Sequence, residues 1–542
     1  MDVTQSSIYA RDNYKDNYYG SILDPLHGDI KLSEIEKWCI SQPIFARLRR
    51  VKQNTFLFYV FPSANHTRFE HSIGVMHLAG KIFDACKDNY ATGKKKSEKY
   101  SEREQSSFFN LGQLRERQEI YYQELRLAAL LHDLGHGPLS HLFDEFAISG
   151  SRFLTLIQQS KTLNNYSQGF QDLIKSNGDK AEHEAISCAF IFYLIDRLKR
   201  KAIEDPHKFS DSTSRIIESI SAERIVKIIE PEFTGLIDEI KDDSGNDYAL
   251  FFSRIVTAFP IDADRMDYLL RDSYFSGVTY GIYDINRIFS SFFAAQRKTG
   301  VIELAIKESG LDSILRFIQS RTHLYNQVYF HKTNRAANTM LSFCTASRRK
   351  ADVKLLDACQ DMAELREFYK KNSDEHFIFY TVNDNLVTKG SVEEQVHNDL
   401  LNRRLFKRVF QSKVVLVGNQ KEKKERVKFI RDEINIKLND LASQGIIATA
   451  DYYDNVTFKD SDKKVILVAN KNQSGHYEFA ESWKDLNAEF RMADITVCMI
   501  RIYLKRCFDN PNTYKLWKKT INDHVAGEIK ELCELADLNP NA

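Results

Sequence analysis

The stretch from Ala129 to Phe146, ALLHDLGHGPLSHLFDEF, places six ionisable side chains among apolar residues: His132, Asp133, His136, His141, Asp144 and Glu145. Burial of an unpaired charge is unfavourable unless a partner compensates it. These side chains must therefore either face solvent or bind something. Any fold of this chain has to satisfy one of these two conditions.

The residues around this stretch indicate a helix that ends beside the ionisable groups. Its apolar face is formed by Leu127, Leu130, Leu131 and Leu134. The Gly-His-Gly sequence and Pro138 that follow are typical of a helix end and a new helix start. His132 and Asp133 are thus expected in a last helical turn, where an imidazole nitrogen and a carboxylate oxygen suit iron, manganese, nickel or zinc. A single His-Asp pair is more commonly a surface or capping pair.

Two further segments carry ionisable residues at helical spacing. In residues 61–83, His71 begins a helix, and Arg68 lies three residues earlier on the same face. In residues 259–278, one face of a helix is polar and the opposite face is apolar; the polar face carries Asp264, Tyr268, Arg271 and Asp272. Either segment alone is typical of a solvated helix face. An ordered set of His, His-Asp and Asp in three such segments is much rarer by chance.

The low contents of proline and glycine, 9 and 22 in 542 residues, indicate long helices. Apolar residues recur at helical spacing in segments 115–134, 214–241 and 306–345. After about residue 410, short β-branched runs at 412–418 and 463–470 flank a helical segment, and a helical tail is expected from Ala493 onward. We therefore predict a mainly α fold, with a helical core and a smaller C-terminal α+β subdomain.

The length of the chain exceeds what one hydrophobic core usually supports. We predict an N-terminal leader over residues 1–23, a helical domain over 24–345, and a C-terminal helical and α+β region over 346–542. The polar stretch 87–107 is expected to interrupt the helical pattern as a surface insertion.

The charges nearly cancel, because 76 Lys plus Arg stand against 75 Asp plus Glu, for a net charge of +1. This balance excludes a whole-molecule field that attracts nucleic acid or membranes, while local basic patches leave nucleic-acid binding open. The eight cysteines are scattered without a CxxC pair, which argues against a zinc finger or a disulfide framework. Because no signal segment and no long apolar run occurs, we expect a cytoplasmic protein without membrane contact.

Several motifs in this order resemble the HD-domain phosphohydrolase superfamily, and within it the deoxynucleoside triphosphate triphosphohydrolases. They are DPLHGDIKL (24–32), FARLRRVKQ (45–53), VFPSANHTRFEHSIGV (60–75), HDLGHGPLSH (132–141), EHEAIS (182–187) and DADRMDYLLRD (262–272). The resemblance is close from about residue 24 to 345, which implies an HD phosphohydrolase domain there, and weaker at 398–407 and 499–506. The 23 residues before Asp24 leave no room for the SAM domain of the vertebrate members, so none is expected.

The resemblance implies one divalent metal ion, held by His71, His132, Asp133 and Asp264. Its identity is open among Fe, Mn, Ni, Zn and Mg, and a further Mg²⁺ on the triphosphate is an option. Such an ion lowers the pKa of a bound water and polarises a phosphoryl oxygen. Reaction at the α-phosphorus would yield a deoxynucleoside and inorganic triphosphate. The leaving 5′ oxygen needs a proton, and any of three histidines could supply it in the expected catalytic group of His136, His141, Asp144, His183 and Glu184.

The expected substrate-binding residues are Gln53, Arg68, Arg265, Tyr268, Asp272, Arg321 and Tyr329. By resemblance, the three arginines contact phosphates, whose oxygens suit guanidinium groups. Tyr329 would lie against the sugar and exclude a 2′-hydroxyl, and Gln53 and Asp272 would hydrogen-bond the 3′ end. Asn54 stands where the vertebrate members have an apolar residue beside the sugar, which leaves selectivity between ribonucleotides and deoxyribonucleotides open.

The resemblance also suggests a regulatory nucleotide site at a subunit interface, with Arg49 of FARLRRVKQ and Arg404 and Lys407 of the segment 398–407 as its expected members. Ser41 and Ala46 replace the acid and the amide that read guanine in the vertebrate members, so a GTP-specific activator is not expected. Activation by a dNTP, or constitutive activity, fits better. The expected partners are the dNTP substrate, a nucleotide activator, and further copies of the chain in a dimer, tetramer or hexamer.

The leading hypothesis is an HD-domain enzyme that hydrolyses dNTPs with a metal ion, with an antiviral role as an option. One alternative is another HD phosphohydrolase, a nucleotide monophosphatase or phosphodiesterase. The three arginines and the sugar-binding set favour a triphosphate over that alternative. A second alternative is a non-catalytic nucleotide or nucleic-acid binding protein, against which the complete metal and histidine set argues.

Overall fold

The computed structural model describes residues 18–100, 108–145, 147–257, 260–297, 299–346, 354–378, 387, 389–416, 420–455, 467–471, 477–480, 496–505, 510–523 and 527. Helices dominate these residues, and the strands form three small sheets. The predicted mainly α fold with a C-terminal α+β part is confirmed. Most of the predicted leader lies outside the described residues, and the first strand begins at Tyr18. Among the described residues, no helix is long and apolar enough to cross a membrane.

The N-terminal two-thirds of the chain contain most of the helices. In chain order they are α1 (Glu34–Ser41), α2 (Pro43–Ala46), η2 (Arg47–Arg50), η3 (Leu57–Tyr59), α3 (Arg68–Tyr100), η5 (Leu111–Leu114), α4 (Arg117–Leu131), α5 (His141–Asp144), α6 (Gly150–Gln159), η6 (Asn164–Tyr166), α7 (Ser167–Ser176), α8 (His183–Glu204), α9 (Asp211–Ser219), α10 (Ala222–Ile229), α11 (Ala249–Val256), α12 (Ala263–Ser276), α13 (Ile285–Phe289), η7 (Glu308–Gly310), α14 (Leu311–Leu324), the π-helix η8 (Tyr325–Tyr329) and α15 (Lys332–Cys344). Three short helices follow: α17 (Met362–Lys371), α18 (Asp374–His376) and α19 (Val392–Leu401).

Helix α4 lies at the centre of the main hydrophobic core and is buried from Tyr121 to Leu131. Its two buried charges are paired: Arg126 with Glu36, and Glu124 with Arg224. Because α4 ends at Leu131, the HDLGH residues begin at the point where the chain leaves the core. Helices α3 and α12 also pack against each other, so three helix termini of this core lie near one another.

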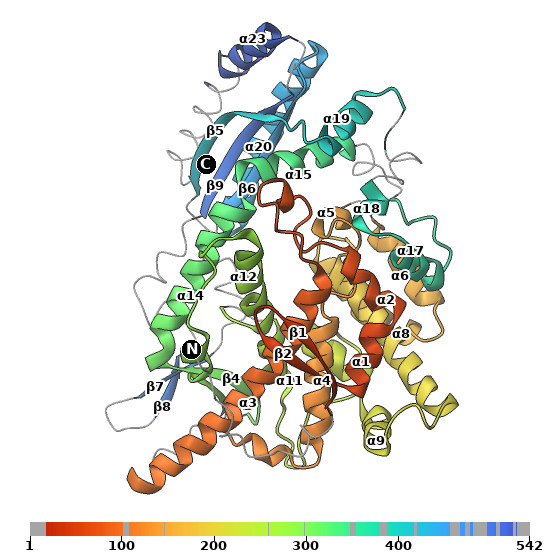
Figure 1. Cartoon of the computed structure of the whole chain (residues 1–542), viewed down its shortest axis with the longest axis vertical. Coiled ribbons are helices and arrows are strands. Elements are labelled where there is room, and N and C mark those ends of the chain that lie inside the picture. The colour runs from red at the N-terminus through yellow and green to blue at the C-terminus, as the bar shows by residue number, and fades with distance from the viewer. Residues whose placement is uncertain are drawn as a thin grey trace.

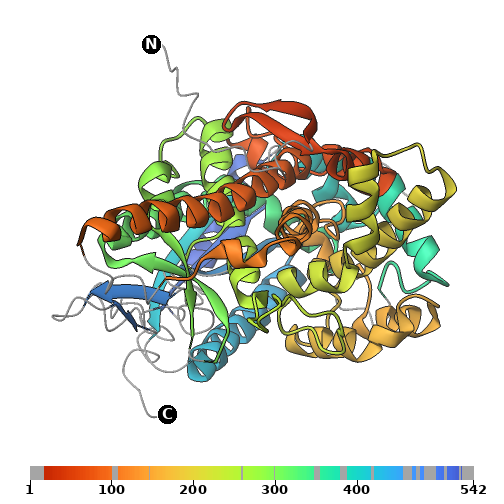
Figure 2. The ribbon, with the colours of Figure 1, turned by 90° about the horizontal axis from the view of Figure 1, so that it is seen from below.

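Helix α3 runs without a break from Arg68 to Tyr100 and crosses the molecule as its longest helix in view (Figure 2). The prediction that residues 87–107 interrupt the helical pattern is wrong for residues 87–100. Lysine, glutamate and alanine are good helix formers, and no proline intervenes, so the helix continues without an apolar face. Residues 101–107 lie outside the described residues.

The segment 214–241 is not one helix. Helix α9 ends at Ser219, α10 begins at Ala222, and the chain is irregular from Glu230 onward because Pro231 cannot continue a helix. The segment 306–345 is helical from Leu311, with the π-helix η8 between α14 and α15. Such π-helical turns frequently occur at functional sites.

The C-terminal part contains a three-stranded antiparallel sheet of β5 (Lys407–Leu416), β9 (Thr496–Leu504) and β6 (Ala448–Asn455), with β9 in the centre. Helices α20 (Gln420–Ser443) and α23 (Pro511–Ile521) pack on this sheet and share a separate hydrophobic core with it. The sheet and these helices lie at one end of the molecule, beyond α15 (Figure 1).

The predicted helical tail from Ala493 is wrong for Thr496–Leu504, which form β9. Both neighbours of β9 are strands, and its residues from Cys498 to Leu504 are all buried. A strand that is buried on both faces reads as a continuous apolar run, and such a run cannot be told from a buried helix by periodicity. Residues 481–495 lie outside the described residues.

Two smaller sheets complete the fold. Strands β1 (Tyr18–Asp24) and β2 (Gly28–Ser33) form an N-terminal hairpin. The other sheet has the order β3 (Phe292–Gln296), β4 (Ile302–Lys307), β7 (Leu467–Lys471) and β8 (Tyr477–Ala480). The run 463–470, which we expected in the C-terminal α+β subdomain, therefore contributes its described residues to a sheet with strands of the helical part, where β7 pairs in parallel with β4.

Gly74 permits the close approach of α3 and α12. A Cβ atom at this position would lie 1.9 Å from Oδ1 of Asp267 and 2.6 Å from Nη2 of Arg271. Both of these side chains are fully buried, so neither can move away without breaking its ion pairs.

We expect Gly74→Ala to destabilise the protein by about 1–3 kcal/mol, because the methyl group overpacks a buried contact. Chemical denaturation of both proteins measures this difference. Gly20→Ala is the matched control, because its Cβ would meet only Lys37 atoms, at 4.0 Å. Equal stability of Gly74→Ala and the wild type would show that the two helices can separate at no cost.

Candidate active site

A cavity of about 500 Å³ opens among α3, α12, η8, α15 and the turn between α4 and α5. This volume is typical of a site for a small ligand. The cavity lining contains most of the site residues predicted from the sequence: Gln53, Arg68, Asp133, His136, His141, His183, Glu184, Asp264, Arg265, Tyr268, Asp272, Arg321 and Tyr329. His71, His132 and Asp144 contact lining residues.

Three of the predicted metal ligands converge on one point. Nε2 of His71 lies 3.1 Å from Oδ1 of Asp264, and Nε2 of His132 lies 3.8 Å from the same oxygen. One ligand atom from each of the three residues lies within 4.8 Å of the others. His71 and Asp264 stand in the first turns of α3 and α12, and His132 caps the end of α4. Three helix termini thus direct these side chains to one place.

Asp133, the fourth predicted ligand, lies beside these three residues and contacts other groups as well. Its Oδ2 atom lies 3.7 Å from Nε2 of His71 and forms an ion pair with Arg68. Its Oδ1 atom lies 3.4 Å from Nε2 of His132 and 3.4 Å from Nε2 of His136. The carboxylate therefore stands between the metal-ligand group and a second group of histidines.

The Nδ1 atoms of both candidate ligands are held by acceptors outside the group. Nδ1 of His71 lies 2.9 Å from Oδ2 of Asp267, and Nδ1 of His132 lies 2.8 Å from the carbonyl oxygen of Ala129. Each contact favours the tautomer with the proton on Nδ1, which leaves the lone pair of Nε2 directed at the common point. Histidine ligands of metal ions are commonly oriented in this way.

The donor set fits a divalent metal ion. Nε2 of His71 and Nε2 of His132 are buried and make no hydrogen bond, so the fold leaves two lone pairs unsatisfied beside Asp264. Burial lowers the pKa of His71, but the neighbouring carboxylates of Asp264 and Asp267 raise it further, to about 10. The surroundings thus favour a positive charge at this point, and the mixed nitrogen and oxygen donors suit a transition metal ion.

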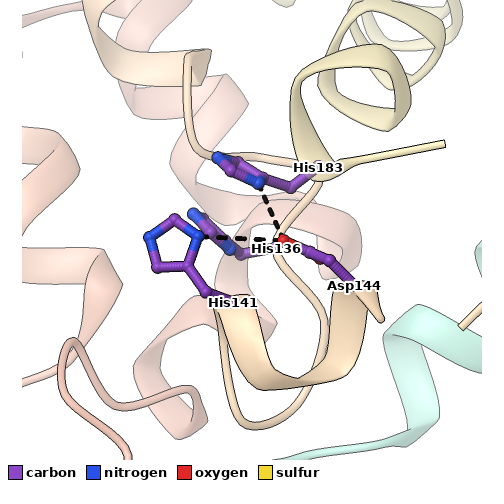
Figure 3. A group of neighbouring side chains, drawn as sticks. All are labelled: His136, His141, Asp144 and His183. Atoms are coloured by element: carbon purple, nitrogen blue, oxygen red, sulfur yellow. Dashed lines mark hydrogen bonds and ion pairs between the residues drawn. The ribbon is translucent and has the colours of Figure 1, made fainter. Parts of the chain in front are cut away.

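A second group surrounds the carboxylate of Asp144 (Figure 3). Nδ1 of His183 lies 3.0 Å and Nδ1 of His141 lies 3.8 Å from Oδ2 of Asp144. The His136 ring stacks on the His183 ring with 3.6 Å between centroids. Glu184 lies 3.3 Å from Nδ1 of His183. All five predicted catalytic residues are therefore brought together.

The two stacked histidines differ in their electrostatic surroundings. Burial lowers the pKa of His183, but Glu184 and Asp144 raise it further, to about 9. For His136, burial and the neighbouring charge of Arg68 hold the pKa well below its usual value. His183 is thus the protonated member of the stacked pair near neutral pH.

Each predicted phosphate-binding arginine already has a partner in the cavity wall. Arg68 contacts Asp133 and donates from Nε to Oγ of Ser140 at 2.9 Å. The Arg265 side chain pairs with Asp262, the residue that caps α12. Arg321 donates from Nε to the Tyr268 hydroxyl at 3.3 Å, and its guanidinium lies over the ring of Tyr325.

Tyr329 and Asp272, two of the predicted sugar-binding residues, belong to one hydrogen-bond network. Tyr329 donates its hydroxyl to Oδ2 of Asp272, and Nδ2 of Asn54 donates to the same oxygen at 2.9 Å. Nε2 of His66 lies 2.6 Å from the other oxygen. Oε1 of Gln53 is buried and makes no hydrogen bond, so it is available to a ligand.

Sequence reasoning missed Arg47, whose side chain hydrogen-bonds the backbone of the HDLGH turn. Its guanidinium donates to the carbonyl oxygens of His136 at 2.7 Å and Leu134 at 2.6 Å. The sequence analysis singled out Arg49, two residues further on, because it matches a family position, but Arg49 is exposed and lies over the ring of Phe69. A buried arginine gives no local signal, because its acceptors here are backbone atoms almost 90 residues away.

Leu139 and Ser140 both adopt positive φ angles, of 66° and 52°, in the turn that lines the cavity. Non-glycine residues rarely adopt this conformation without support from their surroundings. The buried carboxylate of Asp374 accepts from the backbone N–H of Leu139 at 2.7 Å and of Lys52 at 2.8 Å. Burial raises the pKa of Asp374 to about 6. This residue, from α18, was also missed by the sequence analysis.

The predicted regulatory residues lie outside the cavity. Arg49, Arg404 and Lys407 are exposed. Nη1 of Arg404 lies 4.0 Å from Oδ1 of Asp399, and the neighbouring Arg403 donates from Nη2 to the carbonyl oxygen of Tyr59 at 2.7 Å. The structure of one chain leaves their regulatory role a prediction.

Comparisons with known families identify an HD domain over residues 68–201 and an HD associated region over residues 284–455. An uncharacterized protein of Methanocaldococcus jannaschii is 29% identical over 63% of this chain and 53% of its own length. The deoxynucleoside triphosphate triphosphohydrolase SAMHD1 of Homo sapiens is 28% identical over 76% of this chain and 58% of its own length. The chain thus spans between half and three-fifths of the length of these curated relatives. The resemblance inferred from the motifs is confirmed.

Solved structures share the fold. A hypothetical protein from Aquifex aeolicus covers 92% of this chain with a TM-score of 0.54 and 23% identity. A phosphohydrolase from Bacteroides thetaiotaomicron covers 90% with a TM-score of 0.54 and 19% identity. At these identities the likeness establishes the fold alone. Together, the family match and the sequence relatives support a hydrolase of the HD type.

We expect Asp267→Asn to weaken binding of a divalent metal ion by about 10–100-fold, because an amide orients His71 less strongly and lacks the negative charge of the carboxylate. Titration of metal-free protein with Mn²⁺ measures the dissociation constant directly. Asp242→Asn is the matched control: Asp242 is a buried carboxylate with its own hydrogen bonds, and it lies outside the cavity lining. Equal affinities in all three proteins would exclude an orienting role for Asp267.

Proposed function

Because residues 68–201 form an HD domain and the chain resembles the deoxynucleoside triphosphate triphosphohydrolases, we propose that this protein hydrolyses dNTPs to a deoxynucleoside and inorganic triphosphate. The observation that carries the proposal is that one cavity brings together a metal-ligand set, three arginines and the Asp272 network. A site for a monophosphate would not need three guanidinium groups.

His71, His132 and Asp264 would hold the metal ion, with Asp133 beside them. A bound ion supplies positive charge next to a phosphate and lowers the pKa of water in contact with it. Arg68, Arg265 and Arg321 would bind the triphosphate oxygens. Their present partners hold the guanidinium groups in fixed positions, so little side-chain entropy is lost when the substrate binds.

The departing 5′ oxygen has to be neutralised as the bond to phosphorus breaks. The three histidines around Asp144 line the same cavity as Arg68 and the metal-ligand group. His183 is protonated near neutral pH and therefore has a proton to give, and Asp144 orients its ring. His136 and His141 stand as the other candidates, since both rings contact that of His183.

The sugar would lie between Tyr329 and Gln53. The Tyr329 ring would exclude a 2′-hydroxyl there, and its own hydroxyl is fixed by Asp272. The free Oε1 atom of Gln53 can accept from the 3′-hydroxyl. Asn54 is turned toward Asp272, which leaves the space beside the sugar less restricted by an apolar contact.

We further propose that the chain works as a homo-oligomer with a nucleotide activator. The exposed basic groups of Arg49, Arg404 and Lys407 would contribute to the activator site at a subunit interface. A bound nucleotide there would bias the arrangement of subunits. Human SAMHD1, a triphosphohydrolase by name, supports the nucleotide chemistry of this proposal.

Phosphorus NMR of the reaction with each dNTP tests the proposed bond cleavage. We expect inorganic triphosphate as the primary product, because attack occurs at the α-phosphorus. Chromatography of the same samples should show the matching deoxynucleoside. Orthophosphate or pyrophosphate as the primary product would place the attack at another phosphorus and refute the proposal.

We expect Arg321→Ala to reduce kcat/KM for a dNTP by about 10–100-fold, because a charged hydrogen bond contributes roughly 1.5–3 kcal/mol. Steady-state kinetics measure the change. Arg316→Ala is the matched control, since Arg316 is an exposed arginine of the same helix and lies outside the cavity lining. Comparable losses in both variants would show that general charge on α14, and not contact with phosphate, is responsible.

A further inference from the structure

The buried carboxylate of Asp374 joins two segments of the cavity wall that lie far apart in the sequence. Its Oδ1 atom accepts from the backbone N–H of Leu139 at 2.7 Å, and its Oδ2 atom accepts from that of Lys52 at 2.8 Å. Asp374 itself is 3% exposed. Residues 53–55 and 139–142 line the cavity, so both hydrogen bonds reach its wall. One carboxylate therefore sets the position of one segment relative to the other.

The hydroxyl of Ser140 extends this arrangement to Arg68. It donates to the carbonyl oxygen of Lys52 at 2.9 Å and accepts from Nε of Arg68 at 2.9 Å. A second contact joins the same two segments, because the Thr55 hydroxyl donates to the carbonyl oxygen of Leu139 at 2.9 Å. The position of the Arg68 guanidinium thus depends on a hydroxyl whose own place is fixed by both segments.

Helices α17 and α18 support this turn from outside the HD domain. Phe143 of α5 packs against the rings of Phe368, Tyr369 and Phe377, with centroids 5.9, 6.0 and 5.4 Å away. Both helices lie beside α5 in Figure 1. The turn before α5 contains two consecutive residues with positive φ, a conformation that persists only where the surroundings impose it. The aromatic rings hold α5 in place, and the carboxylate of Asp374 holds the backbone of the turn.

We propose that Asp374 is a positioning residue for phosphate binding. Its carboxylate holds the turn of Leu139 and Ser140 in place, and the turn in this position directs Arg68 at a phosphate oxygen. This inference rests on the proposed function, in which Arg68 binds the triphosphate. The Arg68 guanidinium contacts Asp133 through Nη1 and Ser140 through Nε. Two contacts fix the plane of a guanidinium group, whereas one contact leaves it free to turn.

The satisfaction of two buried N–H groups is only part of what this carboxylate does. Burial raises the pKa of Asp374 to about 6, although the two N–H groups and the charges of Lys52 and Arg68 lower it, and Arg47 is a further cation that interacts with it. The carboxylate is therefore charged near neutral pH, at a cost that a neutral acceptor would avoid. A charged acceptor forms the stronger hydrogen bonds. Because its two donors belong to different segments, loss of the charge loosens the contact between them.

Calorimetric titration of the full-length protein with inorganic triphosphate, near neutral pH and without added metal, tests the inference without turnover. We expect Asp374→Asn to raise the Kd about 5–20-fold, because an amide oxygen accepts from only one of the two N–H groups and Arg68 loses its fixed position. Asp242→Asn is the matched control and should leave the Kd unchanged. The buried Asp242 carboxylate also accepts from two backbone N–H groups, those of Ser244 and Asn246, both at 2.9 Å, and it lies outside the cavity lining. Equal Kd values for the wild type and Asp374→Asn would overturn the proposal.

Two further readouts separate a positioning role from a general loss of stability. Ser140→Ala removes the hydroxyl between the turn and Arg68, so the double variant with Asp374→Asn should lose no more affinity for triphosphate than the weaker-binding single variant. Losses that multiply would show that Asp374 acts by another route and would overturn the proposal. Below about pH 6 the wild-type carboxyl is protonated and neutral like the amide, so the Kd values of the wild type and Asp374→Asn should converge. A ratio of Kd values that stays constant with pH would contradict the role of the charge.

Hydrogen exchange keeps this inference separate from the proposed function, because it needs no ligand. In Asp374→Asn, exchange at the amide of Leu139 or of Lys52 should become at least about tenfold faster. Unchanged exchange at both amides would overturn the inference, whereas faster exchange in a protein whose wild type binds no triphosphate would refute the proposed function instead. If Asp374→Asn does not fold, Ser140→Ala alone has to weaken triphosphate binding, and wild-type affinity in that variant would overturn the inference.

Discussion

The carboxylate of Asp267 is the contact on which the arrangement of the site depends. It accepts from the guanidinium of Arg271 and contacts Nδ1 of His71 and Nε2 of His27. Arg271 also pairs with Asp24, so the N-terminal hairpin, α3 and α12 meet at one buried anion. Burial of these charges is tolerable because every charged atom has a partner, and removal of one partner would leave the others uncompensated. The absence of a side chain at Gly74 makes this junction sterically possible.

The candidate metal-ligand set could be predicted from the sequence. The residues that orient these ligands and hold their helices in place could not. His71, the His132–Asp133 pair and Asp264 occur in a fixed order along the chain, and the resemblance to the HD-domain family implies that they hold one metal ion. Asp267 lies on the same helix as Asp264, and the two aspartates differ only in the direction in which their side chains point. On the face of α12 that, taken alone, is typical of a solvated surface, Arg271 is 0% and Asp272 2% exposed. Their partners come from the hairpin and from segment 54–66, and periodicity within one helix carries no information about them.

The same limit explains the errors in the fold. Helical periodicity correctly indicated α4, α14 and α15, which bury residues against neighbours close in sequence or along a regular face. It failed for β9, since the partners of this strand, β5 and β6, begin about 90 and 50 residues earlier. A central strand is defined by such distant pairing, and its local sequence resembles that of any buried segment. It also failed at Asp374, whose function is to satisfy the backbone of a turn more than 230 residues away.

The C-terminal sheet contacts two residues that line the cavity. Phe330 and Arg335 line the cavity at the end of η8 and in α15. The buried carboxylate of Asp451 in β6 pairs with Arg335, and Arg501 in β9 donates to the carbonyl oxygen of Phe330 at 2.6 Å. Lys407, at the start of β5, pairs with Leu504 of β9 in the same sheet. A nucleotide bound near Lys407 would thus act on a sheet whose strands contact residues of the cavity wall. Because Asp451 and Arg501 hold Arg335 and Phe330 through an ion pair and a hydrogen bond, a displacement of β6 or β9 would act on these two residues and, through them, on the cavity wall.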